Sequence, residues 1–122
     1  MTPDTPETLV LIVDDDPTLR GGIAALLGFE RHATLTAATV AEAHGRLDAQ
    51  IPTHALLDLN LPDGLGTAIL RRIRDESRPV RVAMISGNAD DAAMAEARAL
   101  GVDAVFVKPP EWDEVLQWVA QP

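Results

Sequence analysis

The stretch LVLIVDDDP, residues 9–17, decides the fold of this chain. Five branched apolar residues run directly into three aspartates and a proline, and such an apolar run is typical of a strand buried on both faces of a parallel sheet. Asp16 suits the capping position of a helix, and Pro17 suits its first turn. The sequence therefore predicts a helix that begins directly after the acidic turn and ends near Glu30.

The same order of strand and helix recurs along the rest of the chain. A capping box of Thr39 and Glu42 predicts the start of the second helix. Gly101 predicts the end of an alanine-rich helix over residues 90–100, and the segment NLPDGLG at residues 60–66 predicts a loop. Strands are predicted at residues 9–13, 34–37, 55–57, 80–85 and 104–107, and a helix follows each of them.

Five strands that alternate with five helices predict a doubly wound α/β fold. Such a fold is a parallel sheet covered by helices on both faces, with right-handed crossovers. The length of 122 residues fits one domain. We expect a flexible N-terminal tail at residues 1–8 and the domain at residues 9–122.

The composition restricts the possible partners of the protein. The formal net charge is −9, which opposes binding to phosphate backbones and to anionic membranes, so we expect no direct nucleic-acid or membrane contact. Residues 1–8 lack the basic region of a signal peptide, and the chain contains no cysteine. These features predict a cytoplasmic protein without disulfides.

Polar side chains follow the predicted strands at the point where each strand ends. Asp14 and Asp15 follow the first strand, Asp58 the third, Ser86 the fourth and Lys108 the fifth. Ligands of open parallel sheets bind at this edge, so the side chains are predicted to lie together. Three carboxylates repel one another by about 1 kcal/mol per pair in water. A cation would relieve this repulsion, and oxygen ligands favour Mg²⁺, with Mn²⁺ possible, over zinc.

The same residues suit phosphoryl transfer to a carboxylate. Asp58 is the predicted nucleophile and would form an acyl phosphate. Asp15, Asp58 and the main-chain carbonyl of Asn60 are the predicted metal ligands, with Asp14 acting through water. Lys108 would supply a second positive charge, as phosphoryl transfer depends on charge neutralisation.

Two further residues are assigned supporting roles. The Ser86 hydroxyl could donate to a phosphoryl oxygen, and Gly87 beside it would leave room for that approach. Other interpretations stay open for single residues: Ser86 could be an ordinary hydroxyl at a strand end, Lys108 a surface lysine, and Asp14 to Asp16 only an acidic helix cap.

Four motifs in order resemble the receiver domain of two-component response regulators. They are LIVDDDP at residues 11–17, LLDLNLPDGLG at 56–66, MISG at 84–87 and FVKP at 106–109. The resemblance covers nearly the whole chain and is to the stand-alone, single-domain type. It implies a flavodoxin-like (βα)5 fold with strand order 2-1-3-4-5 and, usually, a cis bond before Pro109.

The resemblance also implies a function and partners. A sensor histidine kinase or a phosphotransfer protein would phosphorylate Asp58, and a conformational change would signal to a separate downstream protein. The face of the fourth helix, fifth strand and fifth helix would carry that signal and could form a homodimer. Such a domain catalyses its own phosphorylation and dephosphorylation and is not a conventional turnover enzyme.

The sequence departs from the receiver pattern at two positions. Val105 stands where receivers typically have an aromatic switch residue, and Phe106 is predicted to point to the opposite side of the strand. Pro110, at a position that is often phenylalanine, makes the entry to the last helix stiffer than usual. The phosphorylation chemistry needs neither residue, whereas coupling to a partner depends on this region.

Two other functions compete with the receiver interpretation. The pattern Asp14-x-Asp16-x-Thr18 matches the nucleophile motif of haloacid dehalogenase-type phosphatases. That family has a further acidic pair after the lysine, whereas here Glu111 and Asp113 follow it at the start of the predicted last helix. A receiver-fold module that binds partners without being phosphorylated is the second alternative.

Several other side chains are predicted to lie at the surface. The predicted surface group comprises the arginines of the third helix, Arg71, Arg72 and Arg74. The three histidines, His32, His44 and His54, are predicted to be surface or strand-edge residues. Trp112 and Trp118 are six residues apart and share no helical face, so one is predicted to pack on the core and the other to be partly exposed.

Overall fold

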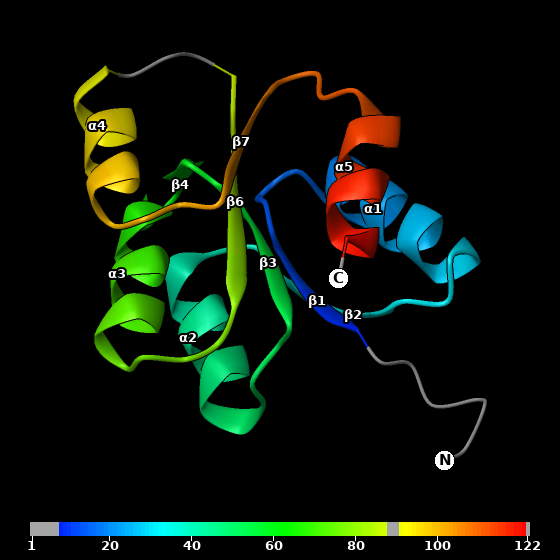
Figure 1. The fold of residues 1–122 in the computed structure, drawn as a ribbon, viewed down its shortest axis with the longest axis horizontal. Helices are drawn as coiled ribbons and strands as arrows, with labels where there is room; N and C mark the ends of the chain where they lie inside the picture. Colours follow the sequence, from blue (N-terminus) through cyan, green and yellow to red (C-terminus); the bar gives the residue numbers. More distant parts are fainter. Residues whose placement is uncertain (1–7, 88–90, 122) are drawn as a thin grey trace.

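A five-stranded parallel sheet forms the centre of the protein (Figure 1). The computed structural model describes residues 8–87 and 91–121. The strand order is β2-β1-β3-β6-β7, and all four neighbouring pairs are parallel. Because β6 and β7 are the fourth and fifth strands of this sheet along the chain, this is the predicted 2-1-3-4-5 order. The strands are β1 (Leu9–Val13), β2 (Ala33–Ala37), β3 (His54–Asp58), β6 (Arg81–Ser86) and β7 (Ala104–Val107).

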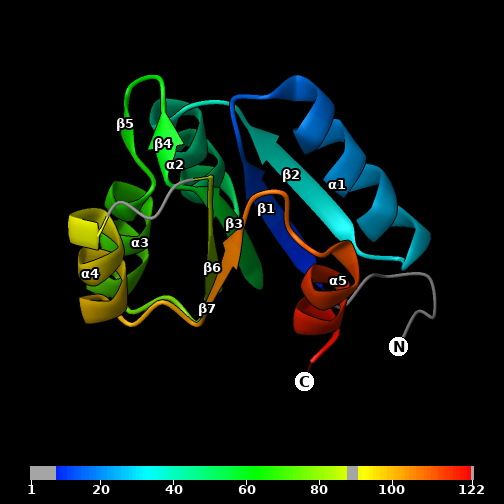
Figure 2. The ribbon, with the colours of Figure 1, turned by 90° about the horizontal axis from the view of Figure 1, so that it is seen from above.

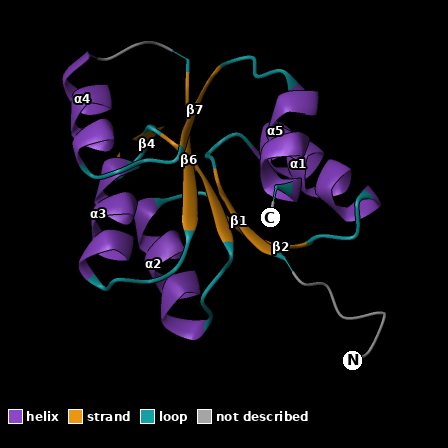
Figure 3. Ribbon diagram, viewed as in Figure 1, coloured by secondary structure: helices purple, strands orange, loops and turns teal. Residues whose placement is uncertain are grey.

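In the described part of the chain, five helices cover the two faces of the sheet. They are α1 (Pro17–Phe29), α2 (Val40–Ala49), α3 (Thr67–Asp75), α4 (Asp91–Ala99) and α5 (Trp112–Ala120). Figure 2 shows α1 and α5 on one face, and α2, α3 and α4 on the other. Helix follows strand around the whole sheet, as Figure 3 shows by colour. The predicted α/β architecture is therefore confirmed.

The alternation of side chains along each strand produces two separate cores. In β1, Leu11 and Val13 pack under α2, α3 and α4, whereas Val10 and Ile12 pack under α1 and α5. All four side chains are buried. A strand covered on both faces must be apolar at every position, which explains the uninterrupted run at residues 9–13.

The predicted helix starts are confirmed by their caps. A carboxylate oxygen of Asp16 accepts from the amides of Thr18 at 2.9 Å and Leu19 at 3.3 Å. The Thr39 hydroxyl accepts from the Glu42 amide at 3.0 Å. These side chains satisfy amides that have no partner within their helices.

The segment after β3 differs from the predicted loop. It forms a two-stranded antiparallel hairpin of β4 (Asn60–Leu61) and β5 (Gly64–Leu65). Its tip is attached to α2, because the Asp63 carboxylate accepts from the amides of Val40 at 2.8 Å and Ala41 at 3.0 Å. Strands of two residues are too short for a periodic pattern, so hydrophobic periodicity could not predict them.

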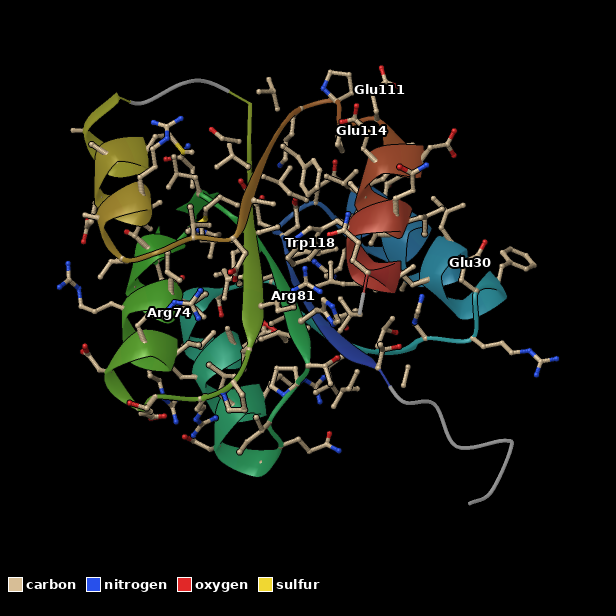
Figure 4. The ribbon with its side chains drawn as sticks, viewed as in Figure 1. Glu30, Arg74, Arg81, Glu111, Glu114 and Trp118 are labelled. Atoms are coloured by element: carbon tan, nitrogen blue, oxygen red, sulfur yellow. The ribbon has the colours of Figure 1, made fainter. Side chains whose placement is uncertain are left out.

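The prediction of a solvated arginine face is wrong for two of the three residues. Arg71 is exposed, but Arg72 and Arg74 are only partly so. Arg74 donates to the carbonyl of Val80 at 2.9 Å and to that of Gly101 at 2.8 Å, joining α3 to the chain before β6 and after α4 (Figure 4). Arg72 donates to the carbonyl of His44 on α2 at 3.1 Å. Long side chains can pack their stems and still reach polar partners.

The prediction of a surface or strand-edge position is wrong for His54, which is the first residue of the central strand β3. His54 is buried and packs edge-on against Trp118 of α5, with ring centroids 5.3 Å apart. Arg81 lies over the same indole at 5.8 Å, and Figure 4 labels both Arg81 and Trp118. Burial is the main cause that lowers the pKa of His54, and the charge of Arg81 adds to it. His54 is therefore neutral at pH 7.

The remaining predictions on aromatic residues and the tail have mixed outcomes. Trp118 is buried and Trp112 is partly exposed, as predicted. Both nevertheless pack against the same core, so the expectation that they share no helical face is wrong. Residues 1–7 of the predicted tail lie outside the described residues. Thr8 is held at the sheet edge, because its carbonyl accepts from the Ala33 amide at 3.2 Å and its hydroxyl bonds to His32.

Candidate functional site

Three aspartates meet at the carboxyl edge of the sheet. Asp14 and Asp15 follow β1, and Asp58 ends β3, the neighbouring strand. One carboxylate oxygen of each residue lies within 4.8 Å of the others. Asp14 and Asp58 are only 3% and 6% exposed, and Asp15 is exposed. The predicted acidic cluster is therefore present.

Lys108 lies within this cluster and contacts two of its acids. Its Nζ is 2.9 Å from Asp14 Oδ2 and donates to Asp58 Oδ2 at 3.2 Å. It is the only lysine in the chain. One ammonium group thus faces three carboxylates, and the cluster retains an excess of negative charge. The alternative of a merely superficial lysine is wrong.

Burial and neighbouring charge shift the pKa of both partners. Burial is the largest cause that raises the pKa of Asp58; the charge of Asp14 also raises it, and the hydrogen bond from Lys108 opposes both. Burial alone would lower the pKa of Lys108, but its hydrogen bonds to Asp14 and Asp58 outweigh burial and raise it. Lys108 is therefore firmly protonated, and the buried Asp58 carboxylate lacks full compensation of its charge.

The main chain holds Asp14 from both sides. The Asp14 amide donates to the carbonyl of Ala37 at the end of β2, and its Oδ1 accepts from the Asp16 amide at 2.9 Å. Arg20 of α1 donates to the Asp14 carbonyl at 2.7 Å. Nothing in the sequence distinguishes Arg20 from an ordinary surface arginine, so sequence reasoning missed it.

Ser86 and Gly87 lie at the end of β6, beside β7. Ser86 is buried, and its carbonyl accepts from the Lys108 amide at 2.8 Å. A Cβ built on Gly87 would have Lys108 side-chain atoms at 4.0 Å as its nearest contacts. The peptide bond between Lys108 and Pro109 is cis. Ser86 and Gly87 therefore border the cluster at the end of β6, the strand next to β3.

Asn60 and Val105 occupy different surroundings. Asn60 begins β4, is exposed, and its amide donates to Asp58 Oδ1 at 3.4 Å.

Val105 of β7 is 37% exposed, while Phe106 packs into the core against Trp118, with ring centroids 6.3 Å apart. The prediction that Phe106 points away from the side of Val105 is confirmed.

The donor set suits a hard divalent cation. Every candidate ligand atom in the cluster is a carboxylate oxygen, and oxygen ligands with excess negative charge are typical of Mg²⁺, Mn²⁺ and Ca²⁺ sites. The two buried acids share a single lysine. The fold and this site together define a protein of the α/β class with an acidic cluster at the carboxyl ends of β1 and β3.

Comparisons with known proteins identify the family. Residues 10–120 match the family model described as the response regulator receiver domain. The acid tolerance regulatory protein ActR of Rhizobium meliloti is 30% identical over 116 residues, which are 95% of this chain and 60% of ActR. The DNA-binding transcriptional activator DevR/DosR of Mycobacterium tuberculosis is 34% identical over 101 residues, covering 81% of this chain and 46% of that protein.

A solved structure agrees with this match. The CheY-like response regulator receiver domain protein from Methanospirillum hungatei JF-1 has a TM-score of 0.87 and 28% identity, covering 92% of this chain and 90% of the other. The chain belongs to the response regulator receiver domain family. This assignment rules out the haloacid dehalogenase-type alternative. The chain spans about half the length of the two curated relatives.

No helix within residues 8–87 and 91–121 is long and apolar enough to cross a membrane. The location of the protein and the absence of nucleic-acid contact stay predictions, and one of the relatives is named as a DNA-binding protein.

Proposed function

We propose that Asp58 accepts a phosphoryl group in a Mg²⁺-dependent reaction, with Mn²⁺ as a possible substitute. One observation carries the proposal: the buried Asp58 carboxylate lies 3.2 Å from Lys108 Nζ inside a cluster of three acids. The lysine and a dication would supply the positive charge that a transferring phosphoryl group requires. Asp58 is the only member of the cluster that is buried, contacts the lysine and ends the central strand β3.

Each residue of the site has a definite task in this reaction. An Asp58 carboxylate oxygen would attack the phosphorus of a phosphorylated histidine on the donor protein. The bond from phosphorus to the histidine nitrogen would break, the histidine ring would leave, and Asp58 would carry an acyl phosphate. Asp15, Asp58 and the Asn60 carbonyl would hold the cation, and Asp14 would act through water. Attack of water on phosphorus would later release inorganic phosphate and regenerate the carboxylate.

The side chains on the opposite side of the cluster would contact the phosphoryl product. Lys108 would bind a phosphoryl oxygen through a charge-assisted hydrogen bond. The Ser86 hydroxyl would donate to a second oxygen, with Gly87 leaving room for it. Pro109, which follows the lysine, and Val105 of β7 would transmit the change.

The partners follow from the same proposal. The phosphoryl donor would be a sensor histidine kinase or a phosphotransfer protein. The signal would pass to a separate downstream protein through the face of α4, β7 and α5, and a homodimer through this face is a further possibility to test. Direct contact with nucleic acid is not expected of residues 9–122, because their acidic character opposes it.

Intact-mass spectrometry tests the proposal directly. Incubation with a small phosphodonor and Mg²⁺ should add one phosphoryl group to the wild type and none to Asp58→Asn. Asp75→Asn, which removes an exposed acid of α3, is the matched control and should be labelled normally. An unchanged wild-type mass, beside a receiver that is labelled under the same conditions, would instead favour the alternative of an unphosphorylated interaction module.

A further inference from the structure

We propose that the β4–β5 hairpin clamps the main chain of Asp58 and Asn60, and that Gly66 and Asp63 are the positioning residues of this clamp. The clamp would set the geometry in which the Asp58 carboxylate and the Asn60 carbonyl meet a divalent cation. The inference rests on the proposed function for the identity of the cation site, and it assigns a role to residues outside that site.

Gly66 is in direct contact with the main chain of the acceptor residue. A Cβ built on Gly66 would lie 2.2 Å from the Asp58 carbonyl oxygen and 3.1 Å from its carbonyl carbon. Both are backbone atoms of a central strand, so they cannot move aside as a flexible side chain can. The Gly66 amide also donates to the Leu59 carbonyl at 2.8 Å.

The backbone conformation of Gly66 does not itself require glycine. Its φ of −59° and ψ of −22° are in the right-handed helical region, which every L-residue adopts without strain. The close approach to Asp58 is therefore the reason for glycine at this position. This distinguishes Gly66 from Gly64, whose φ of 155° is positive.

The other end of the hairpin is held by Asp63. Its two carboxylate oxygens accept separately from the amides of Val40 and Ala41. These backbone hydrogen bonds are the main cause that lowers the pKa of Asp63. The hairpin is thus attached to β3 through Gly66 and to the start of α2 through Asp63.

Asn60 lies between these two attachments. It pairs with Leu65 across the hairpin, and its amide points to Asp58 Oδ1. Asp14 and Asp15, by contrast, follow β1 and do not belong to the hairpin. A displaced hairpin would therefore move Asp58 and Asn60 relative to the acids that follow β1, and the ligands would no longer converge on one cation.

The first test compares two glycine substitutions. Gly66→Ala forces the Asp58 main chain to move, whereas Gly45→Ala places a methyl group where no heavy atom lies within 4 Å. Mg²⁺ affinity is measured by NMR titration of the amides of residues 58–60. We expect at least a tenfold loss of affinity in Gly66→Ala and no loss in Gly45→Ala. Unchanged affinity in folded Gly66→Ala would overturn the proposal.

Asp63→Ala provides a second test that introduces no steric clash. It releases the hairpin from α2, and we expect weaker Mg²⁺ binding, by a few-fold, with shifted Asn60 amide resonances. Phosphorylation should slow at low Mg²⁺ and recover at saturating Mg²⁺, which a general loss of stability would not produce. If Gly66→Ala does not fold, unchanged affinity and Asn60 resonances in Asp63→Ala would refute the clamp.

The two proposals fail in different ways. If the wild type binds Mg²⁺ but is never phosphorylated, the proposed function is wrong, and the affinity measurements still decide the role of the hairpin. If the wild type is phosphorylated and both variants bind Mg²⁺ as it does, only the clamp is wrong.

Discussion

Replacement of Lys108 by methionine should make the protein less stable without Mg²⁺ and, at the same time, increase its affinity for Mg²⁺. The substitution removes the only ammonium group of the cluster and keeps an unbranched side chain of similar length. Asp14 and Asp58, both buried, would then face each other and Asp15 with no counterion. The uncompensated negative charge that destabilises the fold would also attract a dication.

The expected magnitude follows from the geometry of the cluster. Carboxylate oxygens within 4.8 Å of one another repel by about 3.5 kcal/mol per pair at an effective dielectric constant of about 20. The Lys108 side chain is 25% exposed, so solvent already screens part of its effect. We therefore expect a loss of about 2 kcal/mol in the free energy of unfolding in EDTA, and about tenfold tighter Mg²⁺ binding.

Urea unfolding in EDTA and in saturating Mg²⁺, together with isothermal titration calorimetry, would measure both effects. The matched control is Arg71→Met, which breaks the exposed ion pair with Glu96. This change should cost less than about 1 kcal/mol and be independent of Mg²⁺. An equal loss of stability for Lys108→Met with and without Mg²⁺, or weaker Mg²⁺ binding, would refute the electrostatic argument.

Three further predictions concern pH, the cation and the response. Burial lowers the pKa of His54 below its ordinary 6.5, so as the pH falls the unfolded chain takes up a proton before the folded protein does, and the free energy of unfolding should decrease below about pH 6.5. Urea unfolding of His54→Leu between pH 5 and 8 should show a weaker decrease than the wild type. An identical decrease in both proteins would contradict this. Asp15→Ala should lower Mg²⁺ affinity and slow phosphorylation together, and equal affinity by calorimetry would exclude Asp15 as a ligand. Lys108→Ala should retain part of the phosphorylation but show a reduced conformational change by NMR, and a wild-type response would exclude the proposed role of the lysine.

The sheet could be predicted because its sequence signals are local and redundant. The run at residues 9–13 is apolar at every position, and caps at Asp16 and Thr39 mark the helix starts. The β4–β5 hairpin could not be predicted in this way, because its strands pair over two residues and its attachment depends on Asp63 reaching the amides of α2. That contact exists only after the fold has brought the hairpin next to the start of α2.

The acids of the site were predictable for a related reason. Once β1 and β3 are recognised as parallel strands, their carboxyl ends must lie at one edge, and Asp14, Asp15 and Asp58 come together. The sequence does not show that Lys108 contacts both Asp14 and Asp58, since this depends on side-chain placement. Burial of His54 was missed for a similar reason: the residue that covers it, Trp118, comes from the last helix.

Val105 stands at the position where receivers typically have an aromatic residue, and this restricts how a change at Lys108 could reach the face of α4, β7 and α5. Val105 has no ring that could turn between buried and exposed positions, and Phe106 is already packed against Trp118. The direct connection is therefore the main chain that leads from Lys108 through Pro109 to Pro110, which is buried at the entry to α5. Two consecutive prolines restrict the motion of this segment, so a displacement of Lys108 toward a phosphoryl group would be passed on to α5 as a rigid shift. This main-chain connection would place α5 on the proposed route from Lys108 to the face of α4, β7 and α5, and it requires no change of rotamer at Val105.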